Sequence, residues 1–188
     1  MIKEKLYKIY AELGYNDKMY QSELFDRKFT VVENEILISL DLSQMQLDIL
    51  PEEYFQDEEL FKNVKYLGLG YNSLDKLHEN FFDYFPNLEK LELYANNLTS
   101  LPELKLPKLK FLDISSNKLE LSQNIFQYLN ELEFLDIGGN ELTKLNPDVF
   151  SGLNSLKTLN LSENQIETLD NKVFSYLPTL EELFLLAS

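Results

Sequence analysis

The stretch FLDISSNKL, at Phe111–Leu119, is followed by FLDIGGNEL at Phe134–Leu142, so nearly the same nine residues occur twice, 23 positions apart. Both copies keep Leu, Asp, Ile, Asn and a final Leu in the same places, while residues between them change. Self-similarity at a fixed period is the mark of a repeat architecture, in which each repeat is one structural unit. These two stretches therefore predict a chain built from stacked repeats.

The template L-x-x-L-x-L-x-x-N-x-L recurs along most of the chain. Five full copies begin at Val64, Leu88, Leu109, Leu132 and Leu156, and their asparagines are Asn72, Asn96, Asn117, Asn140 and Asn164. The steps between these asparagines are 24, 21, 23 and 24 residues. An earlier copy has Met45 where asparagine is expected, and a last copy begins at Leu180. The sequence thus contains six repeats and a partial seventh.

This pattern resembles that of the leucine-rich repeat family, with mostly 23–24-residue repeats of the typical type and no cysteine caps, from about Ile36 onward. The resemblance implies an α/β fold, namely a curved solenoid with one short parallel strand per repeat on its concave face. The residue pattern agrees, because alternate leucines of a strand point to one side. No repeat can bury that side alone, so neighbouring repeats have to stack.

Two further positions recur with the repeat. We expect the asparagines to form a structural ladder, because a buried side-chain amide can both donate and accept hydrogen bonds where the chain leaves the strand. Nine or ten residues after the asparagine position comes a phenylalanine: Phe55, Phe82, Phe126, Phe150 and Phe174. We expect these rings to form a spine that fills the wider convex side of the solenoid.

Residues 1–35 do not fit the template and are predicted to form a helical N-terminal cap, followed by the solenoid at 36–188. Apolar residues at helical spacing predict an amphipathic helix over Ile2–Leu13. A second short helix is expected around Ser22–Phe25, and Phe29–Val32 has the composition of a strand. Such a cap covers the open end of a repeat stack.

The C-terminal end has no comparable cap, and Phe184–Ser188 would leave an apolar edge strand open to pairing. Three explanations stay open: the chain is truncated, a partner or second copy covers the edge, or the edge is tolerated. One alternative function is therefore a scaffold that forms a homodimer through this edge. Another is a targeting fragment of a larger protein whose catalytic domain lies elsewhere, because the short repeat LPELKLPKL resembles repeats of bacterial effector proteins.

The composition limits the possible binding partners and the cellular location of the protein. The formal charge of −15 argues against nucleic-acid binding, which needs a basic surface, and favours basic partners. No segment has the ~20 apolar residues of a membrane span. The chain has no cysteine and no visible secretory signal, so we expect a cytoplasmic protein, with export without a cleavable signal as the alternative. The glycosylation sequons at Asn97 and Asn160 have no predicted use without export.

Nothing in the sequence predicts an enzyme. There is a single histidine, His78, and no phosphate-binding loop, since the glycines within Gly68–Ser73 fall on a repeat strand. Catalysis needs reactive groups that converge in a pocket, and the repeat pattern indicates no such group. We therefore predict no catalytic residue, no metal site and no cofactor.

The repeat also fixes which side chains face solvent together, because outward positions of stacked strands form columns with about 4.8 Å per step. The first column comprises Ser39, Tyr66, Lys90, Phe111, Phe134, Thr158 and Glu182. The middle column comprises Asp41, Gly68, Glu92, Asp113, Asp136, Asn160 and Phe184. The third column comprises Ser43, Gly70, Tyr94, Ser115, Gly138, Ser162 and Leu186. Its small residues, together with Gly68, are expected to leave room between the larger side chains.

These columns place aromatic residues beside acidic ones, as binding surfaces often do. The predicted partner-binding residues are Tyr66, Lys90, Glu92, Tyr94, Phe111, Asp113, Phe134, Asp136 and Asn160. A basic partner would relieve the repulsion between stacked carboxylates. The alternative is that the aspartates are structural filler, which is common in repeat strands of this family. We predict a non-enzymatic interaction module that binds a protein or peptide with basic and apolar features on its concave face.

Overall fold

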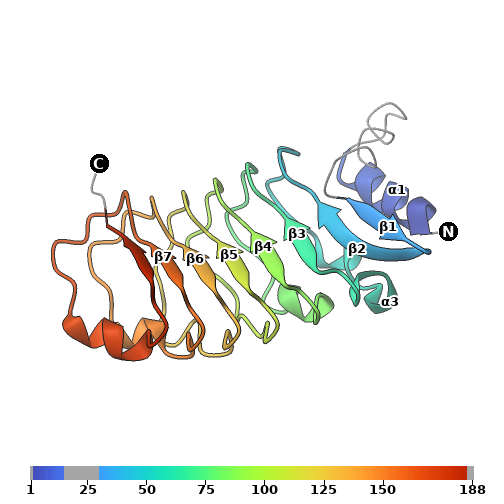
Figure 1. The fold of residues 1–188 in the computed structure, drawn as a ribbon. Coiled ribbons are helices and arrows are strands. Elements are labelled where there is room, and N and C mark those ends of the chain that lie inside the picture. Colours follow the sequence, from blue (N-terminus) through green and yellow to red (C-terminus); the bar gives the residue numbers. More distant parts are fainter. Residues whose placement is uncertain (1, 15–29, 186–188) are drawn as a thin grey trace.

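The structure is a computed structural model that describes residues 2–14 and 30–185. Short strands lie side by side along its length, and from β2 onward each is linked to the next by a loop that returns along the opposite side (Figure 1). The helix α1 (Ile2–Glu12) lies beside the first strands, at the other end from the C-terminus. The predicted leucine-rich-repeat solenoid is thereby confirmed.

Within the described residues the sheet contains eight strands, which follow one another in chain order from β1 to β8. Strand β1 (Val31–Glu33) runs antiparallel to β2 (Ile36–Asp41) and overlaps the segment predicted as a strand, of which Phe29 lies outside the described residues. The other strands are β3 (Tyr66–Gly68), β4 (Lys90–Glu92), β5 (Phe111–Asp113), β6 (Phe134–Asp136), β7 (Thr158–Asn160) and β8 (Glu182–Phe184). From β2 onward neighbours are parallel, because every loop returns the chain to the same edge.

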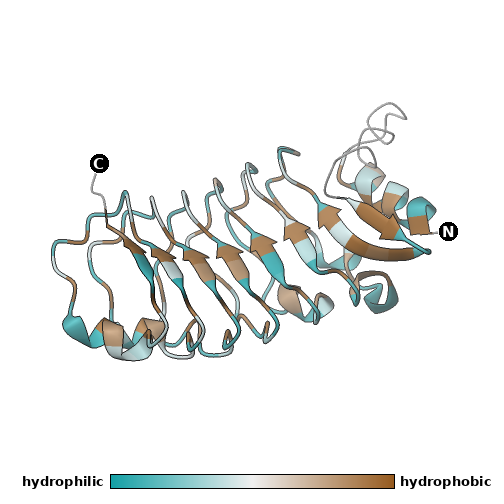
Figure 2. Cartoon of the chain, viewed as in Figure 1, coloured by the Kyte–Doolittle hydropathy of each residue, from teal (hydrophilic) through white to brown (hydrophobic). Residues whose placement is uncertain are grey.

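A leucine occupies the middle of each strand from β3 to β8 and faces the core. Leu67, Leu91 and Leu112 pair in register and are fully buried. Apolar residues therefore alternate with polar ones along several of the strands (Figure 2). Burial of one such side chain is worth about 1.5–3 kcal/mol, so the stacked leucines supply much of the free energy that holds the repeats together.

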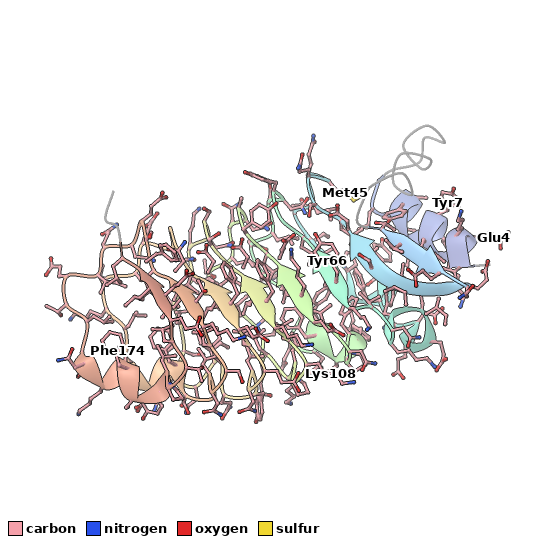
Figure 3. All side chains as sticks on the ribbon, in the orientation of Figure 1. Glu4, Tyr7, Met45, Tyr66, Lys108 and Phe174 are labelled. Atoms are coloured by element: carbon pink, nitrogen blue, oxygen red, sulfur yellow. The ribbon has the colours of Figure 1, made fainter. Side chains whose placement is uncertain are left out.

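Helical turns in the connecting loops hold Phe82, Phe150 and Phe174 of the phenylalanine spine, whereas Phe55 directly follows such a turn and Phe126 lies in a non-helical turn. The helical turns are η1 (Glu52–Tyr54), α3 (Glu58–Phe61), η2 (Phe81–Tyr84), η3 (Pro147–Phe150) and η4 (Asn171–Tyr176). The spine residues Phe55, Phe82, Phe126 and Phe150 are buried. Phe174, on η4 at the end of the solenoid, is 42% exposed (Figure 3). The spine prediction is wrong for Phe174, because no further repeat among the described residues packs against it.

The N-terminal segment packs against the first repeats. Helix α1 buries Leu6 and Tyr10 in the same core as the leucines, and Lys5 Nζ lies 2.5 Å from Asp57 Oδ2. The helix predicted around Ser22–Phe25 lies outside the described residues. The predicted division after residue 35 falls at the end of the turn between β1 and β2. That division into cap and solenoid stays a prediction.

Each asparagine of the ladder bridges two neighbouring repeats. Asn117 Oδ1 accepts the Leu98 N–H of the preceding repeat at 3.0 Å. Its Nδ2 donates to the carbonyl oxygens of Leu93 at 3.0 Å and Ile114 at 3.2 Å. Equivalent bonds are made by Asn72, Asn96, Asn140 and Asn164. In the first repeat the Met45 N–H donates to Asn72 at 3.0 Å, so Asn72 is the first amide of the ladder.

A second ladder is made of charges at the residue directly before each strand. Its members alternate in sign: Lys65, Glu89, Lys110, Glu133, Lys157 and Glu181. Lys65 Nζ lies 3.2 Å from Glu89 Oε1, and Lys157 Nζ lies 2.7 Å from Glu133 Oε2. Exposed ion pairs contribute only about 0–1 kcal/mol each. Their main consequence is for the pairing of neighbouring repeats, because a strand that paired with the next strand but one would place two like charges side by side.

Replacement of a ladder asparagine by alanine is expected to destabilise the solenoid. Asn117→Ala leaves the buried Leu98 N–H without its acceptor, while the Leu93 carbonyl keeps one donor, Asn96 Nδ2, which we expect to lower the free energy of unfolding by about 1–3 kcal/mol. Urea unfolding followed by circular dichroism measures this change. The matched control is Asn97→Ala, because Asn97 is exposed, and we expect it to change stability by less than about 0.5 kcal/mol. Equal effects of the two variants would contradict the bridging role.

Candidate functional site

The outward residues of strands β3–β7 form one solvent-facing surface, which we call the sheet face. Backbone pairing aligns Phe111 with Phe134 and Asp113 with Asp136, one repeat apart. Tyr66 opens the first column on β3 (Figure 3). Within the described residues the strands and the turns after them align the members of the three columns as expected, and Leu186 lies outside them. The expected exposure is wrong for five members, which are buried: Asp41, Ser43, Gly68, Gly70 and Gly138. All nine predicted partner-binding residues are partly exposed rather than buried in the core.

An aromatic stack stands at the centre of the first column. The rings of Phe111 and Phe134 are nearly parallel, with an angle of 3° and 4.4 Å between their centroids. Lys90 Nζ lies 4.4 Å from the centroid of Phe111 and 5.5 Å from that of Tyr66. A cation over a ring face is attracted by the ring's electrons, so Lys90 covers the N-terminal side of the stack.

Glu92 collects two of its neighbours on the sheet face. The Tyr66 hydroxyl donates to Glu92 Oε2 at 2.7 Å, and Lys90 Nζ lies 2.8 Å from Glu92 Oε1. Burial and the bond to Glu92 raise the pKa of Tyr66, which therefore stays a neutral donor. Three of the predicted binding residues thus satisfy one another, and Lys90 offsets the charge of Glu92.

The aspartates of the middle column have a local structural role. Asp113 Oδ1 accepts the Ser115 N–H at 3.0 Å and the Ser115 hydroxyl at 2.6 Å. Asp136 Oδ1 accepts the Gly138 N–H at 2.8 Å, and its Oδ2 accepts from Asn160 Nδ2 at 2.8 Å. Each aspartate therefore ties down the turn that follows its own strand. This observation supports the filler explanation for part of the acidic column.

The charges of these two aspartates are nevertheless not offset by a neighbouring cation. None of the ion pairs within residues 2–14 and 30–185 includes Asp113 or Asp136. Burial raises the pKa of Asp113, the bonds from Ser115 oppose that rise, and the charges of Asp136 and Glu92 add to it. The C-terminal half of the sheet face thus carries negative charge that the protein itself leaves uncompensated.

The expected room beside the small residues exists in only part of the sheet face. A Cβ atom on Gly68 would lie 2.5 Å from the Tyr66 hydroxyl, and one on Gly70 would lie 2.6 Å from Tyr94 Cε1. Neighbouring tyrosines therefore already fill the space over these two glycines, and the prediction of free space there is wrong. Around Gly138 the surface is hollowed.

One aromatic residue of this surface lies outside the predicted set. Tyr71 is 59% exposed, and its ring meets Tyr94 edge-on with 5.1 Å between centroids. Its backbone is left-handed, with φ of 52°, like that of the residue before most ladder asparagines. The sequence could have indicated this residue, because the position directly before a ladder asparagine faces away from the core, and Tyr71 is an aromatic residue at that position.

The described residues hold no group of three or more histidine, aspartate or glutamate side chains arranged to bind a metal ion. No helix in residues 2–14 or 30–185 has the length and apolar character to cross a membrane. The sheet face presents aromatic surface, carboxylates and hydroxyls to solvent.

Comparison with known proteins identifies the repeat. The sequence model of the family described as "Leucine rich repeat" matches residues 62–119 and 130–186, more than half of the chain. Chaoptin of Drosophila melanogaster is 34% identical over 124 residues, which cover 64% of this chain and 9% of Chaoptin.

Two solved structures share the fold. The Toll chain of the Drosophila Toll–Spatzle complex aligns with a TM-score of 0.66 and 28% identity, covering 74% of this chain and 18% of that one. The TLR13–ssRNA13 complex aligns with a TM-score of 0.63 and 37% identity, covering 71% and 20%. The chain therefore spans about a tenth of Chaoptin and about a fifth of the two solved chains.

The raised pKa of Asp113 predicts a pH-dependent stability. The pKa of Asp113 in the folded protein lies above the usual value of 3.8, so with rising pH the unfolded chain loses this proton before the folded protein does. The contribution of Asp113 to the free energy of unfolding therefore falls as the pH rises from 3.8 through the raised pKa. Asp113→Asn keeps an oxygen acceptor for Ser115 and removes the charge. We expect the variant to gain about 0.5 kcal/mol or less at pH 8, because Asp113 is partly exposed, and nothing at pH 3. Thermal unfolding at the two pH values checks this, and a less stable variant at pH 8 would contradict it.

Proposed function

The chain belongs to the leucine-rich repeat family, and on that premise we propose that it is a non-enzymatic module that binds an extended peptide segment on the sheet face. The peptide carries basic and apolar side chains. The observation behind this proposal is the parallel pair Phe111 and Phe134, partly exposed and directly beside Asp113 and Asp136. The predicted concave-face residues are the proposed contact residues.

Apolar side chains of the peptide are proposed to pack on the aromatic stack. Phe111 and Phe134 present ring surface to solvent without contributing to the buried core. Rigid aromatic side chains lose little conformational entropy on binding, which makes them effective anchors. Lys90 covers one side of the stack, so the accessible ring surface belongs chiefly to Phe134.

Basic side chains of the peptide are proposed to pair with the aspartates. Parallel strands place Asp113 and Asp136 about 4.8 Å apart along the sheet, where two carboxylates repel each other. A cation placed between them removes that repulsion and meets carboxylate oxygens that are partly buried, where charge pairs gain strength. The net charge of −15 adds a long-range attraction for basic partners.

The similar solved structures support binding of another macromolecule and leave its class open. One is a complex with Spatzle and the other a complex with single-stranded RNA. For this chain we favour a peptide over RNA, because a polyanion would face the uncompensated aspartates of the sheet face. The cytoplasmic location expected from the sequence gains no support from these comparisons and is not part of the proposal.

The two alternative functions stay predictions. Dimerisation through the C-terminal edge is favoured by the exposed Phe184 and Leu185 at β8. A role as part of a larger effector-like protein rests on the resemblance of the short repeat and on the expected lack of a C-terminal cap. Neither alternative uses the aromatic stack, which is why the sheet-face proposal is preferred.

Removal of the aromatic stack is expected to abolish binding. The probe is a nonapeptide selected from a random displayed library on the immobilised chain, since about nine extended residues match the span of the columns. Phe111→Ala with Phe134→Ala should weaken its affinity at least tenfold, measured by fluorescence anisotropy, while the thermal midpoint changes little because both rings are partly exposed. Phe174→Ala, an exposed phenylalanine off the sheet face, is the control and should bind normally. Unchanged affinity in the double variant would place the site elsewhere.

Charge reversal in the middle column is expected to weaken binding in a salt-dependent way. Asp113→Lys with Asp136→Lys should reduce affinity for the same peptide more at 20 mM than at 500 mM salt, because screening shortens electrostatic range. Glu120→Lys with Glu131→Lys makes the same net charge change at exposed positions outside the columns and serves as the control. If both pairs weaken binding equally at each salt concentration, only net charge matters and the aspartates are not the site.

A further inference from the structure

A hollow opens on the sheet face over Gly138, in the third column directly after β6. Its wall includes Ser115, Asp136, Asn160, Ser162 and Glu163. A Cβ atom on Gly138 would lie 3.0 Å from the carbonyl oxygen of Ser162 and 3.1 Å from Asp136 Oδ1, so only glycine leaves the floor of this hollow open.

At the equivalent position of another repeat, a side chain fills the corresponding space. Gly70 stands in the third column of the β3 repeat, and the Tyr94 ring of the next repeat covers it: a Cβ atom on Gly70 would lie 2.6 Å from Tyr94 Cε1. Gly138 stands at the equivalent place after β6, but the next repeat carries Ser162 there instead of tyrosine. The hollow over Gly138 is therefore the space that a planar side chain occupies at the equivalent site over Gly70.

The wall of the hollow selects the charge of its occupant. Asp136 and Glu163 contribute carboxylates, the Ser162 carbonyl contributes a further acceptor, and no lysine or arginine of the described residues contributes to the wall. Each oxygen of Asp136 already accepts one bond and keeps a second lone pair. Asn160 Nδ2 is already engaged with Asp136. The hollow thus offers acceptors, which a neutral aromatic ring would leave unsatisfied at a cost.

We propose that the hollow over Gly138 receives the guanidinium group of an arginine in the bound peptide. This inference rests on the proposed function, because the hollow lies on the same sheet face and the same repeat as Phe134, two columns across from it. A guanidinium is planar, permanently charged and carries five donors in a fixed fork that suits a carboxylate. Lysine offers a point charge that neither fills a planar space nor binds in two places at once.

The test uses variants that copy the filled site. Position 162 corresponds to position 94, whose tyrosine ring covers Gly70. The ring of Ser162→Tyr should therefore cover Gly138 and fill the hollow, whereas Ser162→Ala leaves the hollow open. The probe is N-acetylarginine methylamide, titrated into ¹⁵N-labelled full-length chain. We expect its amide shifts to cluster at Gly138, Asn160 and Ser162 in the native protein and at the first two in Ser162→Ala. Ser162→Tyr should lose at least tenfold in apparent affinity.

Asp136→Asn provides a second variant if Ser162→Tyr fails to fold. Asn160 stands in the same column and accepts the Ser162 N–H at 2.9 Å, so an asparagine at 136 can keep the bond to Gly138. The substitution removes the charge and also the acceptor of Asn160 Nδ2. We expect it to reduce the arginine response at least threefold. N-acetyllysine methylamide should give a weaker response than the arginine probe in the native protein.

Three results would overturn the proposal: scattered or absent shifts in the native protein, an unchanged response in a folded Ser162→Tyr variant or in Asp136→Asn, or an equal response to the lysine probe. Failure here is distinguishable from failure of the proposed function. If the selected nonapeptide still requires Phe111 and Phe134 while Ser162→Tyr binds it normally, the sheet face stands and only the arginine site falls. If the nonapeptide ignores the phenylalanines, the sheet-face proposal itself fails.

Discussion

The side-chain amide of a buried asparagine joins each repeat to the one before it, and the geometry of the sheet face depends on this bridge. Leucine burial supplies most of the free energy, but apolar contact has no direction and does not by itself fix which residues become neighbours. The amide of Asn117 holds an N–H and a carbonyl group of the preceding repeat at 3.0 Å each. Because the bridge recurs in every later full repeat, Phe111 meets Phe134 and Asp113 meets Asp136 across 23 residues of sequence.

The fold and the columns could be predicted from the sequence because, in a repeat of fixed period, one position determines both the facing of a side chain and its neighbours. The pairing of Phe111 with Phe134 follows from their equal place in the template. Side-chain conformation does not follow from that place. Tyr66 and Lys90 turn toward Glu92, and Tyr94 turns over Gly70, through contacts between repeats that the spacing leaves undetermined. The exposure of Phe174 likewise depends on what packs beyond its own repeat.

The sheet face consequently has two unlike halves. Over β3 and β4 the polar groups of Tyr66, Lys90 and Glu92 satisfy one another, and tyrosine rings fill the space above the glycines. Over β5 to β7 the aspartates hold their own turns, yet no cation of the described residues neutralises them, and the surface is hollowed at Gly138. The proposed peptide contacts therefore concern chiefly the second half, whose negative charge is not offset.

The alignment of repeats into one solvent-facing surface is tested most directly by nuclear Overhauser contacts in the chain with labelled phenylalanine rings. With 4.4 Å between ring centroids, we expect a strong contact between the rings of Phe111 and Phe134. Neither ring should give strong contacts to the methyl groups of Leu112 or Leu135, which point into the core. Ring contacts to those leucines, with none between the two phenylalanines, would mean that the strands lie in another register and that the proposed binding surface does not exist.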